Sequence, residues 1–138
     1  MRALVQRVSR AGVRVQGKLL AEIGPGLLVL LGVTHEDDEA AAERLAAKIL
    51  ALRVFPNAAG QMNEALGSRE VLCVSQFTLY GDTRRGNRPS FMAAARPELA
   101  EPLYELFCER CGAKRGAFGA HMAVELVNDG PVTLLLET

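Results

Sequence analysis

Apolar and polar residues alternate along much of the chain with the period of two that is typical of strands. Residues 2–9 alternate in this way, and residues 12–16 and 19–23 flank a turn at 17–18, which predicts a hairpin. Residues 26–33 are apolar almost without interruption, which favours a strand buried on both faces. The beginning of the chain is therefore predicted to consist of strands.

Helical spacing of apolar residues occurs twice. Thr34 and Asp37 have the spacing of a capping box, with Asp in place of the usual Glu, and predict the start of a helix. The apolar face of this helix would consist of Ala41, Leu45, Ile49 and Leu52. Pro97 suits the first position of a second helix. The apolar stripe of that helix would consist of Leu99, Leu103, Leu106 and Phe107.

The remaining patterns predict further strands and one long connection. Residues 71–74 are an apolar run, residues 122–127 alternate, and residues 132–136 are predicted to form a last strand. Residues 53–55 favour a short strand, and a long loop is expected over residues 56–68. The chain as a whole is therefore predicted to be α+β, with about seven strands and two main helices.

Length and charge restrict the class of protein. A chain of 138 residues predicts a single domain, residues 1–138, that buries about two-thirds of its unfolded surface. No apolar run approaches the roughly 20 residues needed to cross a bilayer, and the amino terminus has no signal-peptide core, so we expect a cytoplasmic protein without a membrane partner. Sixteen basic and sixteen acidic residues cancel, which leaves no global field that would attract a polyanion, and DNA is not expected as a ligand.

Basic residues are nevertheless concentrated in one short stretch. Arg84, Arg85 and Arg88 lie in the glycine-punctuated segment 80–89. A solvated loop is the simpler interpretation of such a cluster, and contact with phosphate groups is the other. The sequence leaves both open.

The cysteines carry little functional information. Cys73, Cys108 and Cys111 are odd in number, and the last two form a C-x-x-C without a second Cys or His pair for zinc. The C-x-x-C also lies on a helical pattern rather than a thioredoxin-like one. We interpret these residues as intracellular thiols at the end of a helix.

Two polar segments follow directly on apolar strands. Residues 75–79 (Ser-Gln-Phe-Thr-Leu) come after the strand 71–74, and residues 128–133 (Asn-Asp-Gly-Pro-Val-Thr) come after the strand 122–127. Strand ends are places where a rigid scaffold presents donors and acceptors to a ligand. More than fifty residues separate the segments, so the fold or a partner subunit must bring them together if they act as one site.

The usual catalytic side-chain arrangements are absent from the sequence. Only His35 and His121 could serve as a histidine base, and no Gly-x-Ser-x-Gly elbow surrounds Ser75. The acidic run 36–39 is explained by its place at a helix start. No metal-ligand spacing, Gly-x-Gly-x-x-Gly or P-loop occurs, so no metal or cofactor is expected. An enzyme with this sequence would lack the usual side-chain machinery.

The two polar segments together resemble the motif pair of the D-aminoacyl-tRNA deacylases. Residues 1–10, 24–34, 88–91 and 118–120 also resemble that family, so the likeness covers nearly the whole chain. It implies a curved, mostly antiparallel and barrel-like sheet in a dimer-forming domain. It further implies a homodimeric enzyme that hydrolyses the ester between a D-amino acid and the terminal adenosine of tRNA.

The resemblance assigns chiral selection to the second segment. It implies that the Gly130–Pro131 peptide bond is cis and reaches into the pocket of the partner subunit, with support from Arg7 and Asn128. Carbonyl groups of this loop would fix the substrate's α-amino group, and an L-side chain would collide with the loop backbone. A site that selects by exclusion should accept many D-residues, and glycine has no side chain to exclude.

The resemblance assigns the catalytic segment to Ser75, Gln76, Phe77 and Thr78. The terminal adenosine would be held by Gln76, Phe77, Phe118 and Met122. A backbone N–H of Phe77 or Thr78 would suit an oxyanion role, and the tRNA 2′-OH would help to activate water. Thr78 as the nucleophile is the alternative, although no base adjoins it in the sequence.

Other functional hypotheses stay open. A non-catalytic dimeric tRNA-binding module would bind without turnover, and a conventional Ser/Thr esterase would form a covalent acyl-enzyme. Two departures from the family pattern occur: His121 stands where an acidic residue is expected, and the segment 111–117 is a few residues short. Either could change the surroundings of the site, and His121 could also change its response to pH.

Overall fold

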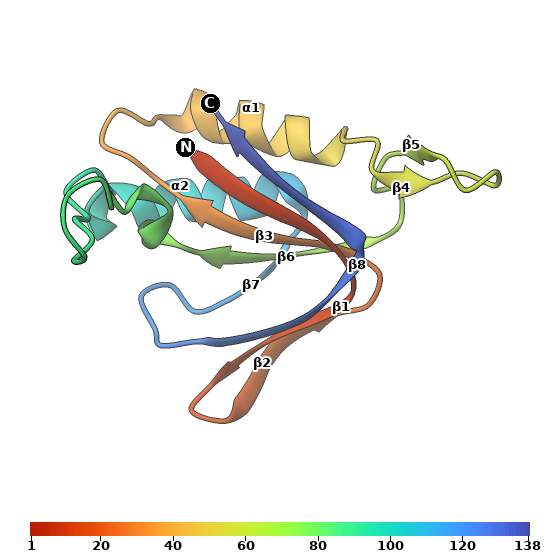
Figure 1. Ribbon diagram of the computed structural model, residues 1–138, viewed down its shortest axis with the longest axis horizontal. Helices are drawn as coiled ribbons and strands as arrows, with labels where there is room; N and C mark the ends of the chain where they lie inside the picture. The colour runs from red at the N-terminus through yellow and green to blue at the C-terminus, as the bar shows by residue number, and fades with distance from the viewer.

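One long, bent strand organises the sheet. In the computed structural model, which describes residues 1–138, β1 (Arg2–Val15) pairs antiparallel with three other strands (Figure 1). β3 (Gly26–Gly32) pairs with its first half, β2 (Lys18–Ile23) with its second half, and β8 (Ala123–Glu137) with nearly its whole length. The predicted strands 2–9 and 12–16 are therefore one strand.

Two parallel strands extend the sheet beyond β3. β6 (Glu70–Ser75) lies beside β3, and the two-residue β7 (Lys114–Arg115) lies beside β6, in the order β2-β1-β3-β6-β7. The sheet curves until β2 approaches β6 and β7, which nearly closes it. The α+β class and the curved, mostly antiparallel, barrel-like sheet are confirmed.

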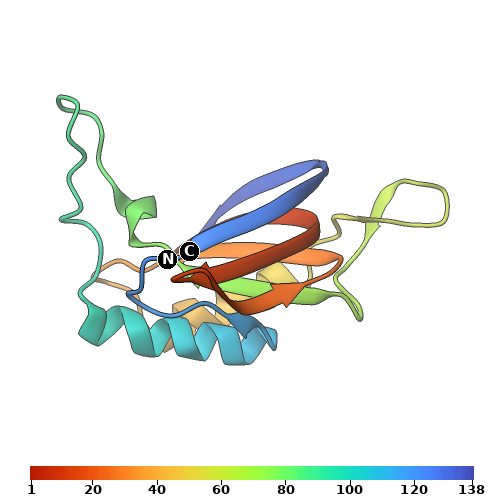
Figure 2. The same ribbon diagram turned by 90° about the horizontal axis from the view of Figure 1, so that it is seen from below.

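Two helices cover one face of the sheet. α1 (Glu39–Leu50) and α2 (Pro97–Cys111) pack against each other, and Figure 2 shows both on the same side of the strands. A core of 25 buried residues lies between helices and sheet, and a second cluster of 7 lies inside the curve of the sheet. Neither helix is long and apolar enough to cross a membrane. Pro97 begins α2 as predicted, because proline needs no N–H partner there.

The start of α1 differs from the prediction. Thr34 and Asp37 do interact, since the Thr34 N–H donates to Asp37 Oδ2 at 2.7 Å. The cap of the helix is instead Asp38, whose side chain accepts from the Ala41 N–H at 2.8 Å, so α1 begins at Glu39. The predicted capping box is therefore a turn that precedes the helix.

Three short elements lie where the sequence predicts loops or other boundaries. β4 (Phe55–Pro56) overlaps the end of the predicted short strand 53–55, and it forms a hairpin with β5 (Met62–Glu64), which lies within the predicted long loop. β7 was not predicted, because two residues carry no periodicity. The predicted strands 122–127 and 132–136 are both parts of β8, because they pair with the same partner, β1.

Candidate active site

The first polar segment leaves the sheet at the end of β6. Ser75 is the last residue of β6, and the Gln76 N–H still donates to the carbonyl of Leu31 at 2.7 Å. The chain then turns into a single 3-10 turn, η1 (Phe77–Tyr80). Gly32 at the end of β3 permits this close approach, because a Cβ there would lie 3.1 Å from the Gln76 carbonyl oxygen.

Contacts with β1 fix the far end of η1. Arg2 Nη1 donates to the Leu79 carbonyl at 2.9 Å, and its guanidinium carbon lies 4.5 Å from the centre of the Tyr80 ring. Burial raises the pKa of Tyr80 to about 12. Residues 76–80 are thus held between β3 on one side and β1 on the other, although no side chain in η1 is fully buried.

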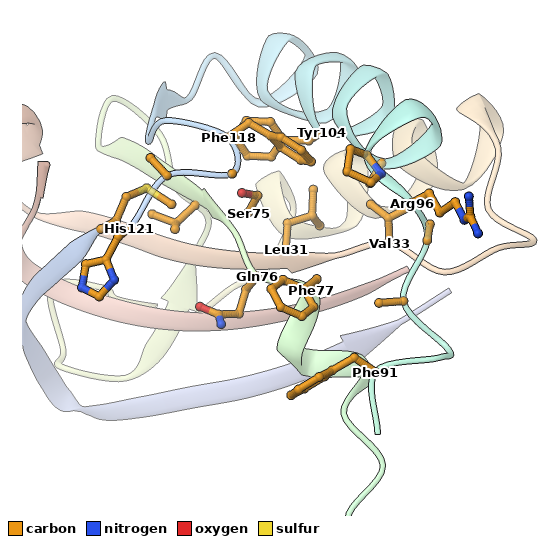
Figure 3. A pocket seen from close by; sticks show the side chains of 18 of the residues that line it. Leu31, Val33, Ser75, Gln76, Phe77, Phe91, Arg96, Tyr104, Phe118 and His121 are labelled. Atoms are coloured by element: carbon orange, nitrogen blue, oxygen red, sulfur yellow. The ribbon is translucent and has the colours of Figure 1, made fainter. Parts of the chain in front are cut away.

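A pocket of about 600 Å³ opens beside this segment. Figure 3 shows Ser75, Gln76 and Phe77 on one side and the chain around Phe118 and His121 opposite them. The other lining residues include Leu31, Val33, Phe91, Arg96, Tyr104 and Met122. The volume lies in the range of pockets that enclose a small organic ligand.

Two pairs of aromatic rings line the pocket. Tyr104, on α2, and Phe118 have ring centres 5.8 Å apart, and Tyr104 is buried. Phe77 and Phe91 meet edge to face at 5.2 Å, and both are exposed, at 56% and 39%. The pocket therefore offers flat apolar surfaces of the kind that bind a nucleobase.

The pocket contains no carboxylate, and its charged or titratable side chains besides Tyr104 are Arg96 and His121. No hydrogen bond joins His121 to a hydroxyl group, and the ring of His35 bonds instead to the Met92 carbonyl at 2.7 Å. The Thr78 hydroxyl oxygen accepts a hydrogen bond from the Gln76 side-chain amide. An amide donor cannot take up the hydroxyl proton, so no hydroxyl here has the base that a nucleophile needs.

The second polar segment bulges out of β8. Asn128 pairs with Val8 and Thr133 with Gln6, so four residues of β8 stand opposite the single residue Arg7. Asn128 Nδ2 closes the base of this bulge by donating to the carbonyls of Arg7 and Val132, both at 3.0 Å. The exposed Gly130 and Pro131 lie at its tip.

Arg7 supports the bulge from inside the protein. Its side chain is buried and donates to the carbonyl of Val54 and, from Nε at 3.2 Å, to the carbonyl of Asp129. Nε also lies 3.4 Å from the Asp129 carboxylate. Gly130 has a φ of +92°, and a Cβ added there would overlap Arg7 Nη2. Glycine is thus required by both the backbone angle and the contact.

The expected cis bond is absent from this structure, since no peptide bond of the chain is cis. The trans form of a Gly-Pro bond is favoured by about 0.5–1 kcal/mol, and exposed Pro131 has little surrounding structure to reverse that preference. Gly130 and Pro131 do not line the pocket of their own chain. One chain therefore does not join the two polar segments into one site.

The basic cluster lies apart from the pocket. Arg84, Arg85 and Arg88 line a separate polar hollow with Asp82 and Ser90. Arg84 forms a two-pronged ion pair with Asp82, with Nη2 to Oδ2 at 2.6 Å and Nε to Oδ1 at 2.9 Å. These bonds lower the pKa of Asp82 and raise that of Arg84. Arg85 and Arg88 have no acidic partner, so their charges are available to a ligand.

The three cysteines belong to the core. Cys73, Cys108 and Cys111 are all free thiols and all buried. Burial raises the pKa of Cys111 to about 12 and also raises that of Cys73. Tyr104 Oη donates to the Cys73 carbonyl at 2.9 Å, which ties α2 to β6 behind the pocket. No group of three or more His, Cys, Asp or Glu residues is placed to hold a metal ion.

Sequence reasoning did not name several lining residues. Arg96 reaches the pocket because α2 begins beside it, and Tyr104 lies on the face of α2 that lines it. Phe91 reaches the pocket because the chain returns from the basic loop. Arg96 directly precedes Pro97, the predicted first residue of the second helix, so its place at the start of a helix could have been predicted from the sequence. Phe91 lies at the end of the segment 88–91 that resembles the deacylases, so its position could have been suspected but not its contact with Phe77.

The fold and pocket define a class: a small α+β protein with an apolar, carboxylate-free pocket that is suited to a nucleoside. Comparison with known proteins gives the family. The family model described as D-Tyr-tRNA(Tyr) deacylase matches residues 4–137. D-aminoacyl-tRNA deacylases of Symbiobacterium thermophilum and Idiomarina loihiensis are 58% and 54% identical to this chain, and each alignment covers at least 96% of both proteins.

Solved structures agree with this result. A structure titled c-Myc DNA Unwinding Element Binding Protein has a TM-score of 0.94 and 43% identity, over 100% of this chain and 99% of that one. A probable eukaryotic D-amino acid tRNA deacylase has a TM-score of 0.86 at 16% identity, covers 98% and 97%, and supports the fold alone. The chain belongs to the D-Tyr-tRNA(Tyr) deacylase family, and it is an enzyme of the D-aminoacyl-tRNA deacylase type.

Proposed function

We propose that this protein hydrolyses the ester of D-aminoacyl-tRNA and releases the free D-amino acid and tRNA, acting as a proofreading step of translation. The observation that carries the proposal is the pocket itself, in which residues 75–77 face Phe118 and Met122 without any carboxylate or histidine–hydroxyl pair. Such a site can bind and orient a reactive ester, whereas its hydroxyl groups have no base to activate them for covalent attack. The names of the relatives support the same activity.

The terminal adenosine is placed between the two walls of the pocket. Phe118 and Met122 offer apolar surface to the base, and the Gln76 side chain and Phe77 offer polar and aromatic contacts from the opposite wall. Met122 is held close to the backbone, since a Cβ on Gly116 would lie 2.7 Å from Met122 Sδ. The rigid walls would keep the ester at a fixed position relative to η1.

The reaction is proposed to use the substrate's own hydroxyl group. Water attacks the ester carbonyl carbon, assisted by the 2′-OH of the terminal ribose, and the leaving 3′-oxygen takes up a proton. The negative charge on the carbonyl oxygen is stabilised by the first N–H groups of η1, at Phe77 and Thr78, which a helical turn leaves without partners in its own turn.

Thr78→Ala separates this mechanism from nucleophilic catalysis by Thr78. Its hydroxyl accepts from Gln76 and has no base, so we expect kcat to fall less than tenfold. A loss of kcat of about a thousandfold or more in this variant, together with labelling of Thr78 in the wild-type protein by a phosphonate probe, would mean that Thr78 forms an acyl-enzyme. Ser68→Ala, outside both the pocket and the arginine-rich loop, is a control for removal of an exposed hydroxyl group.

The tip of the β8 bulge is proposed to select the D-enantiomer in the pocket of a partner subunit. Gly130 and Pro131 are exposed and outside their own pocket, while Arg7 and Asn128 keep the bulge in shape. Its backbone would fix the α-amino group and leave no room for an L-side chain. Glycyl-tRNA would also be hydrolysed, because glycine presents nothing for the loop to exclude.

The surface of β8 supports a homodimer. β8 pairs only with β1, and it leaves Val127, Leu134 and Leu135 exposed on a strand with a free edge. A free edge with apolar side chains is a common site of association with another chain. A second copy on this surface would be close to the β8 bulge.

Subunit mixing tests the shared site. Homodimers of Gly130→Ala, with an intact pocket, and of Phe77→Ala, with an intact bulge, should both be nearly inactive. If each site combines two subunits, random exchange between them should restore about one quarter of the wild-type activity, because half the dimers are mixed and each has one intact site. Failure of any activity to return after verified exchange would contradict a shared site.

Matched D- and L-aminoacyl-tRNA provide the test of the whole proposal. Release of the D-amino acid at least a hundredfold faster than the L-form is the expected result. Equal rates would contradict chiral selection, and binding without release of either would favour the non-catalytic tRNA-binding module. A single-stranded DNA competitor should be included, because one similar structure is titled as a DNA-binding protein.

The basic cluster is proposed to bind phosphate groups of the tRNA. Arg85 and Arg88 lack acidic partners, whereas Arg84 is paired with Asp82. Removing one free arginine should weaken tRNA binding and reduce the slope of log K against log salt by about 0.7–0.9. Arg44→Gln, on the exposed face of α1, should leave both quantities unchanged.

A further inference from the structure

Residues 81–96 form an arm, and Figure 2 shows that its outer part stands away from the rest of the protein. Near its base the Asp82 N–H donates to the Ser90 carbonyl at 2.7 Å, and the Ser90 N–H donates back at 2.9 Å. This bridge closes the arginine-rich tip, residues 83–89, into a loop. The arm then returns along the pocket, to which it contributes Phe91 and residues 94–96.

The returning half of the arm is fixed to the end of β3. The Thr34 hydroxyl donates to the Ala93 carbonyl at 2.6 Å, and the ring of His35 bonds to the Met92 carbonyl at 2.7 Å. The Ala95 N–H donates to the carbonyl of Val33 at 2.9 Å. These contacts set the position of the backbone directly after Phe91.

Phe91 is held against the pocket but stays partly uncovered. Its ring meets that of Phe77 edge to face, and Gly81 lies close against it, since a Cβ there would be 3.0 Å from Phe91 Cε1. Phe77 and Phe91 are the only aromatic residues among the large apolar side chains that are exposed. A fixed and partly open aromatic pair leaves a flat surface at the edge of the pocket for another ring.

We propose that this aromatic pair binds the unpaired base that precedes the terminal adenosine of the tRNA, with Phe91 as the stacking residue. The inference rests on the proposed function, in which the adenosine lies between the two walls of the pocket and contacts Phe77. Phe91 lies on the side of Phe77 away from Phe118 (Figure 3), so its ring is left for the preceding base. Ser90, the residue before Phe91, lines the hollow with Arg85 and Arg88. A single strand leaving the pocket would thus meet first an aromatic surface and then free positive charges, the combination that binds single-stranded nucleic acids.

Charge favours RNA over a second protein copy as the occupant. The cationic residues next to Phe91 include two without acidic partners, and the chain as a whole is neutral. The arm also exposes Met92, but the group of exposed apolar residues that suits a dimer, Val127, Leu134 and Leu135, lies on β8. A polyanion with exposed bases matches both properties of the arm.

The test uses an uncharged RNA hairpin with a single-stranded CCA end, in which 2-aminopurine replaces the middle base of that end. Stacking on Phe91 should quench its fluorescence when the wild-type protein binds. Phe91→Leu, which keeps an apolar side chain but removes the ring face, should abolish the quenching and weaken binding about tenfold. Phe91→Tyr keeps the ring and should behave like the wild-type protein. Unchanged quenching with Phe91→Leu would overturn the proposal.

Kinetics with two substrates give a second measurement. Phe91→Leu should raise KM at least fivefold for D-aminoacyl-tRNA and leave KM unchanged for D-aminoacyl-adenosine, which lacks the preceding base. An equal rise for both substrates would overturn the inference, because Phe91 would then act on the adenosine or the aminoacyl group. A change of oligomeric mass in Phe91→Leu would also overturn it, because the arm would then be a subunit contact.

These measurements separate the inference from the proposed function. Quenching uses uncharged RNA, so wild-type quenching without D-specific hydrolysis would reject the function and retain the stacking site. D-specific hydrolysis without any quenching would retain the function and reject the stacking site.

Discussion

The two polar segments of this protein are built in opposite ways. Residues 75–80 emerge from a buried strand, are fixed to β3 and β1, and form a wall of a pocket within their own chain. Residues 129–132 bulge from an edge strand, expose Gly130 and Pro131 at the tip, and do not line the pocket beside residues 75–77. The first segment therefore forms part of a pocket wall, whereas the second projects from the surface.

Their means of support also differ. The pocket segment is positioned by backbone hydrogen bonds, by close packing against Gly32, and by one side chain, Arg2, at its far end. The β8 bulge depends on two side chains, the buried guanidinium of Arg7 and the amide of Asn128. The bulge should therefore be more sensitive to single substitutions than the pocket segment.

Arg7→Ala should cause the largest loss. It removes donors to the carbonyls of Val54 and Asp129 and leaves space under the bulge, so we expect about 2–3 kcal/mol of destabilisation in urea unfolding and loss of D-specific hydrolysis. Arg14→Ala is the matched control on the same strand. Its pair with Glu125 is exposed, at 3.7 Å, and removing it should cost about 0.5 kcal/mol or less. Equal losses for the two variants would show that the bulge does not depend on Arg7.

Gly130→Ala should be milder for stability but severe for activity. The added Cβ meets the positive φ and Arg7 Nη2, which should cost about 1–2 kcal/mol. Displacing the bulge should reduce D-specific hydrolysis at least a hundredfold if the proposed role is right. Gly60→Ala has a similar φ of +78° but open space around it, so its stability cost of about 1 kcal/mol should leave hydrolysis unchanged. Full activity in Gly130→Ala would remove the bulge from the site.

Tyr104→Phe tests the other region, behind the pocket. It deletes the hydrogen bond to the Cys73 carbonyl, but that carbonyl still accepts from the Gly116 N–H at 3.0 Å. Because no buried acceptor is left unpaired, we expect a cost of only about 1 kcal/mol by urea unfolding. A cost above about 3 kcal/mol would mean that the pocket wall also depends on single side-chain bonds.

The sequence predicted the elements better than their connections. Strand alternation and helical spacing are local, so the strands, α2 and the polar strand ends could be recognised. The continuity of β1 and of β8 depends on pairing between residues more than a hundred positions apart, and no local pattern encodes it. The pairing of Phe91 with Phe77 was missed for the same reason.

The predicted details that were wrong involve choices between nearly equal alternatives. Asp38 replaced the Thr34 and Asp37 pair at the start of α1, because both arrangements offer a side-chain acceptor to a free N–H. The Gly130–Pro131 bond is trans rather than cis, and the free energies of the two forms of such a bond differ by only about 0.5–1 kcal/mol. The surrounding tertiary structure decides between such alternatives, and the local sequence does not reveal that structure.

The Tyr80→Phe substitution should have the smallest effect on stability, and this effect should appear only at alkaline pH. Burial raises the pKa of Tyr80 from 10.0 to about 12 in the folded state. The folded protein therefore binds more protons than the unfolded chain between these values, so stability falls as pH rises from 10 to 12. Without the hydroxyl this contribution disappears, and the unfolding free energy should decline less steeply over that interval while staying nearly unchanged at pH 7. Parallel curves for the two proteins would show that the Tyr80 hydroxyl titrates normally and that the end of η1 is more open than the rest of the pocket wall.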